Sequence, residues 1–475
     1  MKMRAMWACV VAGSLLSAAA ASTGSTARDE SLVGAPRTFY VSAAGADDRD
    51  GLSPDRAWRS IDRVNIADLT GGDQVLFEGG QTFVGALLLH RANVRVGEAP
   101  LVIGSYGGRA TLASGSNGAV TAVGVGGIEV RDLTLRGGGA ASGASGLIFL
   151  NDTRTTLAHV HVHDVEISGY TNAIYMAAGE APARYERVRL ERLDIHDNAM
   201  GPSLWGYFEA PPNGATKAYG LRDVYIGHSR SHRNTGGGLS GGYGSGLFIL
   251  NAEDVIVEHN TVHDNGGDNP EKSPNGPSGI TIYDGRNVLV QHNEVFHQRF
   301  HVNNQTDNGG IDLWAQRALV QYNYVHDNEG WGFIFGSASG PGVAPGTGWL
   351  SGDVTLRYNI AERNARRLPG RDELAPYAGA TVLMFGQIEN FDISSKRSPT
   401  AARVCASGDE CAVRGPEAVT RSSSPRTEAS AVSGTGAAAS ASRWRAPVWS
   451  CWSPLTAGKT ARTGASRSVS AKWTT

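Results

Sequence analysis

VEHNTVHDN, residues 257–265, decides the fold, because related segments recur along the chain at intervals of 28 to 36 residues. The other copies are VRDLTLRGG (130–138), VHDVEISGY (162–170), LERLDIHDN (190–198), IGHSRSHRN (226–234), VQHNEVFHQ (290–298), VQYNYVHDN (320–328) and LRYNIAERN (356–364). Apolar and polar residues alternate in twos within the copies, as in β-strands, and no helical period is present. A repeat of this length predicts a solenoid, in which each coil buries the apolar face of its neighbours.

A second short apolar segment follows each copy at a variable distance. These segments are GLIFL (146–150), AIYM (173–176), GLFIL (246–250), GITIY (279–283), GIDLW (310–314), GFIFG (332–336) and TVLMF (381–385). Each repeat therefore predicts two or three short strands joined by Gly and Asn turns, with equivalent strands of successive coils about 4.8 Å apart. This is an all-β fold, and the alignment places Val257, Val290, Val320 and Leu356 in one buried column.

Polar residues also recur at fixed positions of the repeat. Asn260, Asn293, Asn323 and Asn359 occupy one position, and a second set of Asn residues stands five positions later, at 198, 234, 265, 328 and 364. Asn adopts left-handed backbone readily and hydrogen-bonds along a stack, so both sets predict ladders at corners. His196, His232, His263 and His326 form a similar column, for which we expect stacking rather than metal binding, because metal ligands must converge on one point.

The two ends of the chain differ from its body. Residues 1–21 have a basic start, an apolar run and small residues typical of an export signal, so we expect a secreted or periplasmic protein with no membrane span. Residues 396–475 are low in complexity, with 12 Lys and Arg against 4 Asp and Glu, and we expect disorder or a shifted reading frame there. The remaining 22–395 form the predicted domain. Its chain carries an acidic excess, which argues against nucleic acid as a partner.

The repeat and the N-terminal segment resemble the right-handed parallel β-helix superfamily, which includes pectate lyases, polygalacturonases, alginate lyases and chondroitinase B. The N-terminal segment is TFYVSAAGADDRDGLSPDRAWRSIDRVN (38–65) with GGDQVLFEGGQTFVG (71–85). It is similar to the start of many secreted bacterial β-helix proteins, which implies a strand and a short helix capping the first coil. The resemblance covers about 38–395 and implies a polysaccharide as partner. No catalytic motif of one subfamily is present, since the paired Asp47 and Asp48 fall in the N-terminal turn.

Asp312 is the first candidate for catalysis, because an acid midway along a strand is disfavoured by β propensity. Alternation places Asp312 and Trp314 outward, with Tyr283 and Thr281 outward one coil earlier. We expect a groove across these residues and Ile334, walled by the long turns 265–279 and 297–310. Further catalytic candidates in these coils are Asp284, Glu329, Lys272, Arg299 and His301. Tyr283, Trp314 and Asp307 are expected to bind substrate, and Asp268 with Glu271 to hold Ca²⁺ if the protein is a lyase.

Three functions remain open from the residues. The first is a polysaccharide-cleaving enzyme, either a hydrolase with two carboxyl groups or a lyase with a base and a cation. The second is a non-catalytic glycan-binding or surface protein, and the third is an inactive truncated product. In each case we expect a monomer.

Overall fold

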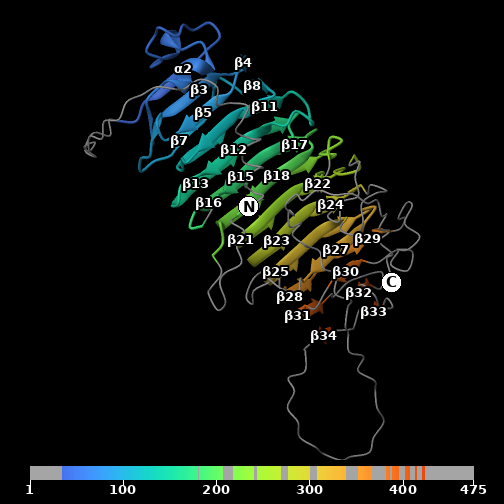
Figure 1. Ribbon diagram of the computed structural model, residues 1–475. Coiled ribbons are helices and arrows are strands. Elements are labelled where there is room, and N and C mark those ends of the chain that lie inside the picture. The colour runs from blue at the N-terminus through green and yellow to red at the C-terminus, as the bar shows by residue number, and fades with distance from the viewer. Residues whose placement is uncertain are drawn as a thin grey trace, which may run out of the picture.

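The computed structural model describes residues 35–179, 181–206, 218–239, 243–268, 276–299, 308–337, 351–365, 381–385, 388–394, 402–406, 412–414 and 420–422. In this part of the chain nearly all regular structure is β. Helix α2 (Ile61–Asn65) and a turn of 3-10 helix, η1 (Pro54–Arg56), lie at the N-terminal end of a long series of stacked strands (Figure 1). The strands of successive coils lie side by side along one axis.

Three stacks of parallel strands form the faces of the molecule. Stack A contains β4 (Thr82–Val84), β8 (Ala110–Gly115), β11 (Leu133–Gly137), β14 (Glu166–Ser168), β17 (Asp194–His196), β20 (Arg230–His232), β22 (Thr261–His263), β24 (Glu294–Phe296), β26 (Tyr324–His326) and β29 (Ile360–Glu362). Stack B contains β5 (Leu87–His90), β9 (Val120–Val123), β12 (Ser145–Asn151), β15 (Asn172–Ala178), β18 (Met200–Trp205), the first halves of β21 (Leu247–Glu258), β23 (Ile280–Gln291) and β25 (Gly309–Gln321), and then β27 (Trp331–Gly336), β30 (Val382–Phe385) and β32 (Ala402–Ala406).

Stack C contains β1 (Thr38–Val41), β3 (Gln74–Glu78), β7 (Leu101–Tyr106), β10 (Ile128–Arg131), β13 (Thr156–His163), β16 (Arg184–Glu191), β19 (Leu221–Gly227), the second halves of β21, β23 and β25, and then β28 (Gly352–Arg357) and β31 (Glu389–Ser394). A coil runs from stack C to stack A to stack B and back. Strand β13, for example, returns to pair in parallel with β10, placing Val160 beside Ile128. The all-β parallel coil predicted from the repeat is therefore confirmed.

The core is a set of aliphatic columns that run through the coils. The predicted column is present, because Val257 pairs with Val290, Val290 with Val320 and Val320 with Leu356 in register. The three valines have no exposed surface and Leu356 is 5% exposed. Each inward side chain thus packs between equivalent side chains of the coils on either side.

Both Asn ladders are present, but the left-handed position differs from the expectation. Asn260 donates through Nδ2 to Asn293 Oδ1 at 3.0 Å, and Asn293 donates likewise to Asn323. The residues with positive φ are those one position earlier, such as His259 and His292 (φ 55° and 54°). The expectation was wrong on this point. The Asn side-chain amide is what the ladder requires, and the residue before it adopts the left-handed conformation, which turns the chain so that this side chain points into the coil.

The N-terminal cap has the predicted strand and helix, β1 and α2. Ser60 caps α2 by accepting a hydrogen bond from the Arg63 amide. Asp47 accepts hydrogen bonds from the Arg59 and Ser60 amides and from the Ser60 hydroxyl, so it ties this cap together. Two further short strands, β2 (Leu69–Thr70) and β6 (Val94–Arg95), pair beside the cap.

Sheet pairing continues past residue 395. Strand β32 extends stack B by pairing with β30, and it pairs in turn with the antiparallel strand β33 (Ala412–Arg414). Strand β34 (Thr420–Ser422) pairs antiparallel with β31. The other residues of the predicted 396–475 tail, like the predicted signal at 1–21, lie outside the described residues.

Candidate functional site

Asp312 lies in the stack B half of β25, on the outer side of the strand. Its neighbours Ile311 and Leu313 point into the core and are 0% and 1% exposed, so the predicted alternation is confirmed. Asp312 itself is also 0% exposed, although it faces away from the core. The carboxylate is thus buried on the outside of the coil rather than standing in open solvent.

The Asp312 carboxylate accepts hydrogen bonds from two aromatic side chains. The Tyr283 hydroxyl, one coil earlier, donates to Oδ2 at 2.7 Å, and the Trp314 indole Nε1–H donates to Oδ1 at 3.1 Å. The Trp314 ring lies over Gly336 of the next coil, where an added Cβ would come within 1.9 Å of the ring. A glycine at 336 is therefore required for the indole to reach the carboxylate.

A row of aromatic side chains crosses five consecutive coils on this outer side. It consists of Tyr175, Trp205, Phe248, Tyr283 and Trp314, and we call it the aromatic row. The ring centroids are 5.1 Å apart between Trp205 and Phe248, 5.8 Å between Phe248 and Tyr283, and 5.7 Å between Tyr283 and Trp314. Asp312 therefore lies at one end of a continuous apolar and aromatic surface, with its carboxylate beneath the last two rings.

Apolar side chains extend the aromatic row toward the N-terminal coils. Ile148, Leu150 and Ala177 form an outer cluster with Tyr175 and Trp205, and the first three are at most 7% exposed. In the next coil the Trp205 indole donates to Ser203 Oγ at 2.7 Å, two residues earlier in the same strand. Trp314 repeats this arrangement with Asp312, but a carboxylate replaces the hydroxyl.

Asp284, a predicted partner of Asp312, lies at the bend of β23 between stacks B and C. Its φ is 55° and it is 0% exposed. Asn251 occupies the equivalent bend one coil earlier (φ 58°) and donates to Asp284 Oδ2 at 3.5 Å. Asp284 thus continues a corner ladder of polar residues.

Glu329 and Arg299 lie near corners of the coil rather than on the outer side of stack B. Glu329 is exposed in the turn between β26 and β27. Arg299 is exposed beyond β24 and lines a shallow cavity with Asp197, Arg233 and Asp264. The predicted residues are therefore only partly brought together: Tyr283, Asp312 and Trp314 are in contact.

The predicted calcium site has one described member, Asp268. Its side chain is exposed, and its backbone pairs with Thr235 and Gly238. Calcium takes six to eight oxygen ligands, so Asp268 alone does not define a site. Glu271, Lys272, His301 and Asp307 lie outside the described residues.

The predicted histidine column is a stack of parallel rings. His232 lies 4.9 Å from His263 with ring planes 6° apart, and Phe296 continues the column at the same spacing. Phe296 stands where the coils on either side have His263 and His326, which agrees with a role in packing. Parallel rings do not converge on one point, so the column is not a metal site.

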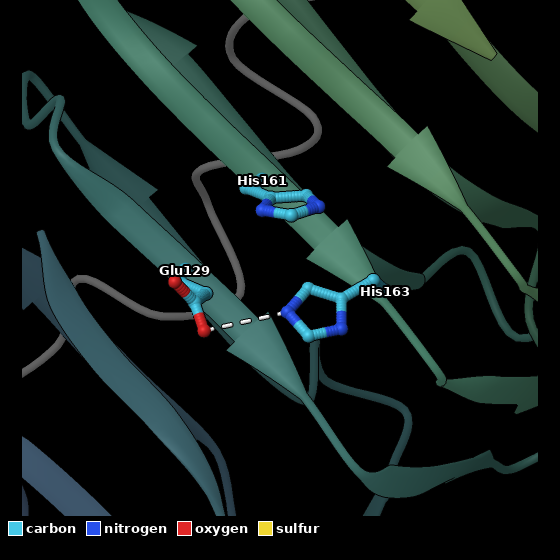
Figure 2. Close-up of side chains that lie close together, drawn as sticks. All are labelled: Glu129, His161 and His163. Carbon is cyan, nitrogen blue, oxygen red and sulfur yellow. Dashed lines mark hydrogen bonds and ion pairs between the residues drawn. The ribbon is translucent and has the colours of Figure 1, made fainter.

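Among the described residues one group does converge, and the sequence reasoning missed it. Glu129, His161 and His163 place one ligand atom each within 4.8 Å of one another on the outer side of stack C. Figure 2 shows the three side chains close together on two neighbouring strands. The signal was present in the HVHVHD segment (159–164). Alternation puts His161 and His163 on one face of a strand, and the repeat sets Glu129 beside them.

The comparisons with known proteins agree on the fold. Residues 118–316 match the family model described as a right handed beta helix region. No curated protein matches the sequence. No helix among the described residues is long and apolar enough to cross a membrane.

Solved structures similar to this chain include a GH136 lacto-N-biosidase from Eubacterium ramulus. Its selenomethionine derivative is 19% identical, with a TM-score of 0.51 and coverage of 79% of this chain and 67% of that one. The native form is 20% identical with a TM-score of 0.49, covering 71% and 66%. An alginate lyase from Paenibacillus sp. is 14% identical with a TM-score of 0.41, covering 79% and 96%. This chain spans about two thirds of the lacto-N-biosidase.

Identities of this size speak to the fold alone. The three stacks of parallel strands and the match to the right handed beta helix family model agree with one another. The protein is a right-handed parallel β-helix, as the resemblance in its repeat implied.

Proposed function

We propose that the protein binds a polysaccharide along the aromatic row and cleaves its glycosidic bonds there, with Asp312 as the acid or base. Asp312 is the observation that carries the proposal. Thr281 and Ile334 occupy the same register position in the coils on either side. Because an apolar residue fills this column equally well, the fold does not require an acid at 312. Burial of a carboxylate costs several kcal/mol unless hydrogen bonds offset it.

The aromatic row supplies the binding surface in this proposal. Aromatic rings offer rigid apolar surface to the C–H faces of sugars, and the hydroxyl of Tyr283 and indole N–H of Trp314 add polar contacts. The row follows the coil axis over β15 to β25, which suits an extended chain of sugars better than a single small ligand. Asp312 would meet the bond to be cleaved at one end of that chain.

The chemistry within this proposal is either hydrolysis or β-elimination. Hydrolysis needs a second carboxyl group across the glycosidic bond, for which Asp307 of the 297–310 turn is a candidate. Glu329 lies at a corner, five residues before the neighbour of Asp312 in the next coil, Ile334, and is too distant. Elimination needs a base and a cation near the sugar carboxylate, with Lys272 and His301 as candidates, since Arg299 lines a separate cavity. A panel of uronate-containing and neutral glycans, including lacto-series oligosaccharides, separates the two. Elimination yields an unsaturated product that absorbs in the ultraviolet, and hydrolysis yields only new reducing ends.

Asp312→Asn tests the role of the carboxylate. The amide keeps an acceptor for Tyr283 but cannot transfer a proton, so turnover should fall about 100-fold or more. Melting temperature should fall as well, because the amide nitrogen replaces the oxygen that accepts from Trp314 Nε1–H, so turnover is compared at a temperature at which the variant is folded. Asp254→Asn, an exposed acid in the stack C half of β21, is the matched control and should keep full activity. Unchanged turnover in Asp312→Asn would disprove the catalytic role. If that variant does not fold, Asp312→Ser, which can still accept from the Trp314 indole as Ser203 does from Trp205, gives the same comparison.

A non-catalytic glycan-binding protein is the second candidate, and one observation favours it. Both oxygens of Asp312 already accept hydrogen bonds, and the side chain has no exposed surface. Asp312 would then act as an anchor that holds Trp314 in the aromatic row. In that case the intact protein binds a glycan without releasing products, and Trp314→Ala weakens the binding.

A further inference from the structure

We propose that Glu129, His161 and His163 bind a divalent transition-metal ion, such as Zn²⁺, on the outer side of stack C. This site is separate from the aromatic row and does not depend on the proposed function. Two imidazoles and one carboxylate form a donor set that suits zinc and other first-row transition metals. Calcium and magnesium prefer oxygen ligands only, so they are excluded as the main occupants.

The geometry follows from the pairing of β10 with β13. Glu129 lies directly beside His161 in the register, and His163 follows His161 by two residues, so all three side chains leave the sheet on the same side. The atoms His163 Nε2 and Glu129 Oε1 are 3.3 Å apart, and the two imidazole centroids are 4.3 Å apart (Figure 2). Ligand atoms on a tetrahedral zinc lie roughly 3.4 Å apart, given bonds of about 2.1 Å. Small side-chain rotations would bring the three ligand atoms to this spacing.

Each imidazole also has a carboxylate behind it. His163 Nδ1 lies 2.7 Å from Asp164 Oδ2, and His161 Nε2 lies 2.7 Å from Glu191 Oε1. A neutral imidazole that donates through one nitrogen carries a lone pair on the other, which is the form that binds metal. Carboxylates in this position orient metal-binding histidines and raise their basicity. Asp164 and Glu191 would act here as positioning residues.

The second histidine distinguishes this group from similar pairs elsewhere in the chain. His196 has the same relation to Asp197 (2.7 Å) and to a carboxylate of the preceding coil, Glu166 (3.5 Å). No equivalent of His161 accompanies that pair, and the described residues place only Glu129, His161 and His163 together as a possible metal set. The His–Asp pair alone is thus a repeated structural feature. In the part of the chain that the structure describes, three ligands converge only at β10 and β13.

An ion can reach this site and would compete with one basic side chain. Glu129, His161 and His163 are 21%, 24% and 15% exposed at the side chain. Arg131 Nε lies 3.2 Å from Glu129 Oε1, so it neutralises the carboxylate in the absence of metal. Binding would turn Arg131 away and link two adjacent coils through a metal bridge, which should stabilise this part of the solenoid.

Zinc binding by the full chain tests the proposal. The chelator-treated protein is dialysed against Zn²⁺ to measure stoichiometry and affinity, and Co²⁺ is used as a spectroscopic substitute. We expect one ion per chain at this site, a rise in melting temperature with Zn²⁺, and Co²⁺ bands of a site with nitrogen and oxygen ligands. His161→Gln and Glu129→Gln should each weaken zinc binding about 100-fold or more, and Asp164→Asn about 10- to 100-fold.

His196→Gln is the matched control, because it removes a His–Asp pair from a coil without a second histidine. It should leave zinc affinity and the Co²⁺ spectrum unchanged. If one variant does not fold, the remaining ligand variants give the same comparison, since each ligand lies on the outer side of the sheet. The proposal is overturned if zinc does not bind stoichiometrically, if His161→Gln binds zinc as tightly as the parent, or if His196→Gln weakens binding equally.

Discussion

Left-handed residues set the corners of this solenoid, and their side chains form stacks of their own. His259, His292 and Tyr322 have φ values of 54° to 55°, which costs a non-glycine residue about 1 kcal/mol or more. Their rings stack at 4.9 and 5.2 Å. Ring stacking and the hydrogen-bonded Asn that follows each of these residues offset that cost in these three coils. At the residue scale, the corner is thus a two-residue unit of a turning residue and an inward amide.

His232 in the neighbouring histidine column gives the fold a pH dependence. Burial lowers its pKa from 6.5 to about 4, although a hydrogen bond to Asp194 partly opposes the shift. Between these two values the unfolded chain binds more protons than the folded one, so stability falls as pH drops. The stability that the neutral His232 contributes is fully present above pH 6.5 and is lost as the pH falls to about 4. This difference in the free energy of unfolding is on the order of 2 kcal/mol.

His232→Phe should reduce this acid sensitivity. Phe296 already occupies the same column, stacked 4.9 Å from His263, so a phenyl ring fits the position. We expect the variant to be less stable than the parent at pH 7.5, because it loses the hydrogen bonds of His232 with Asp194 and Arg233, and to lose less stability than the parent between pH 7.5 and pH 4.5. Denaturant unfolding at both pH values measures the difference. Equal losses of stability in parent and variant would show that His232 does not titrate in this range.

At the scale of the strand, positions whose side chains point into the core tolerate fewer substitutions than positions whose side chains point outward. Val290 lies between Val257 and Val320 with no exposed surface, so Val290→Asp would bury a charge that has no partner. We expect the variant not to fold, or to lose more than about 4 kcal/mol of stability. Val290→Ala, the control for lost volume alone, should cost about 2 kcal/mol. Thermal unfolding measures both, and a tolerated Val290→Asp would contradict the register.

The same contrast explains what the sequence could and could not predict. Inward residues obey the repeat, so Val257, Val290 and the Asn ladders were readable from spacing alone. Asp312 was readable as an acid midway along a strand, where β propensity disfavours one. Its burial was not, because that depends on Tyr283 and Trp314 and on how outward side chains pack, which alternation does not determine. Glu129 and His161 come from different repeats, and the alignment of 130–138 with 162–170 already sets them side by side, as the pairing of β10 with β13 shows. The convergence of their ligand atoms depends on side-chain rotamers, which the spacing does not determine.

At the scale of the molecule, stability is a sum of contacts between neighbouring coils. Each end coil has a neighbour on one side only, so the structure that covers the ends matters more for stability than in a globular domain. The N-terminal end is closed by β1, α2 and the Asp47 contacts. At the other end β33 and β34 run antiparallel to the last coils. An antiparallel strand ends the parallel pattern and so blocks further stacking on the exposed edge.

Limited proteolysis tests where the folded solenoid ends. The composition of 396–475 predicts that most of this tail has too few apolar residues to pack, so trypsin should remove much of it early. Of the 43 Lys and Arg residues, 31 lie before residue 396, so the body offers more cleavage sites than the tail. We therefore expect a resistant fragment that ends at or after β31, identified by its intact mass. Its resistance would come from the fold and not from a lack of sites. Equally fast cleavage between β12 and β28 would contradict a continuous, cooperative solenoid.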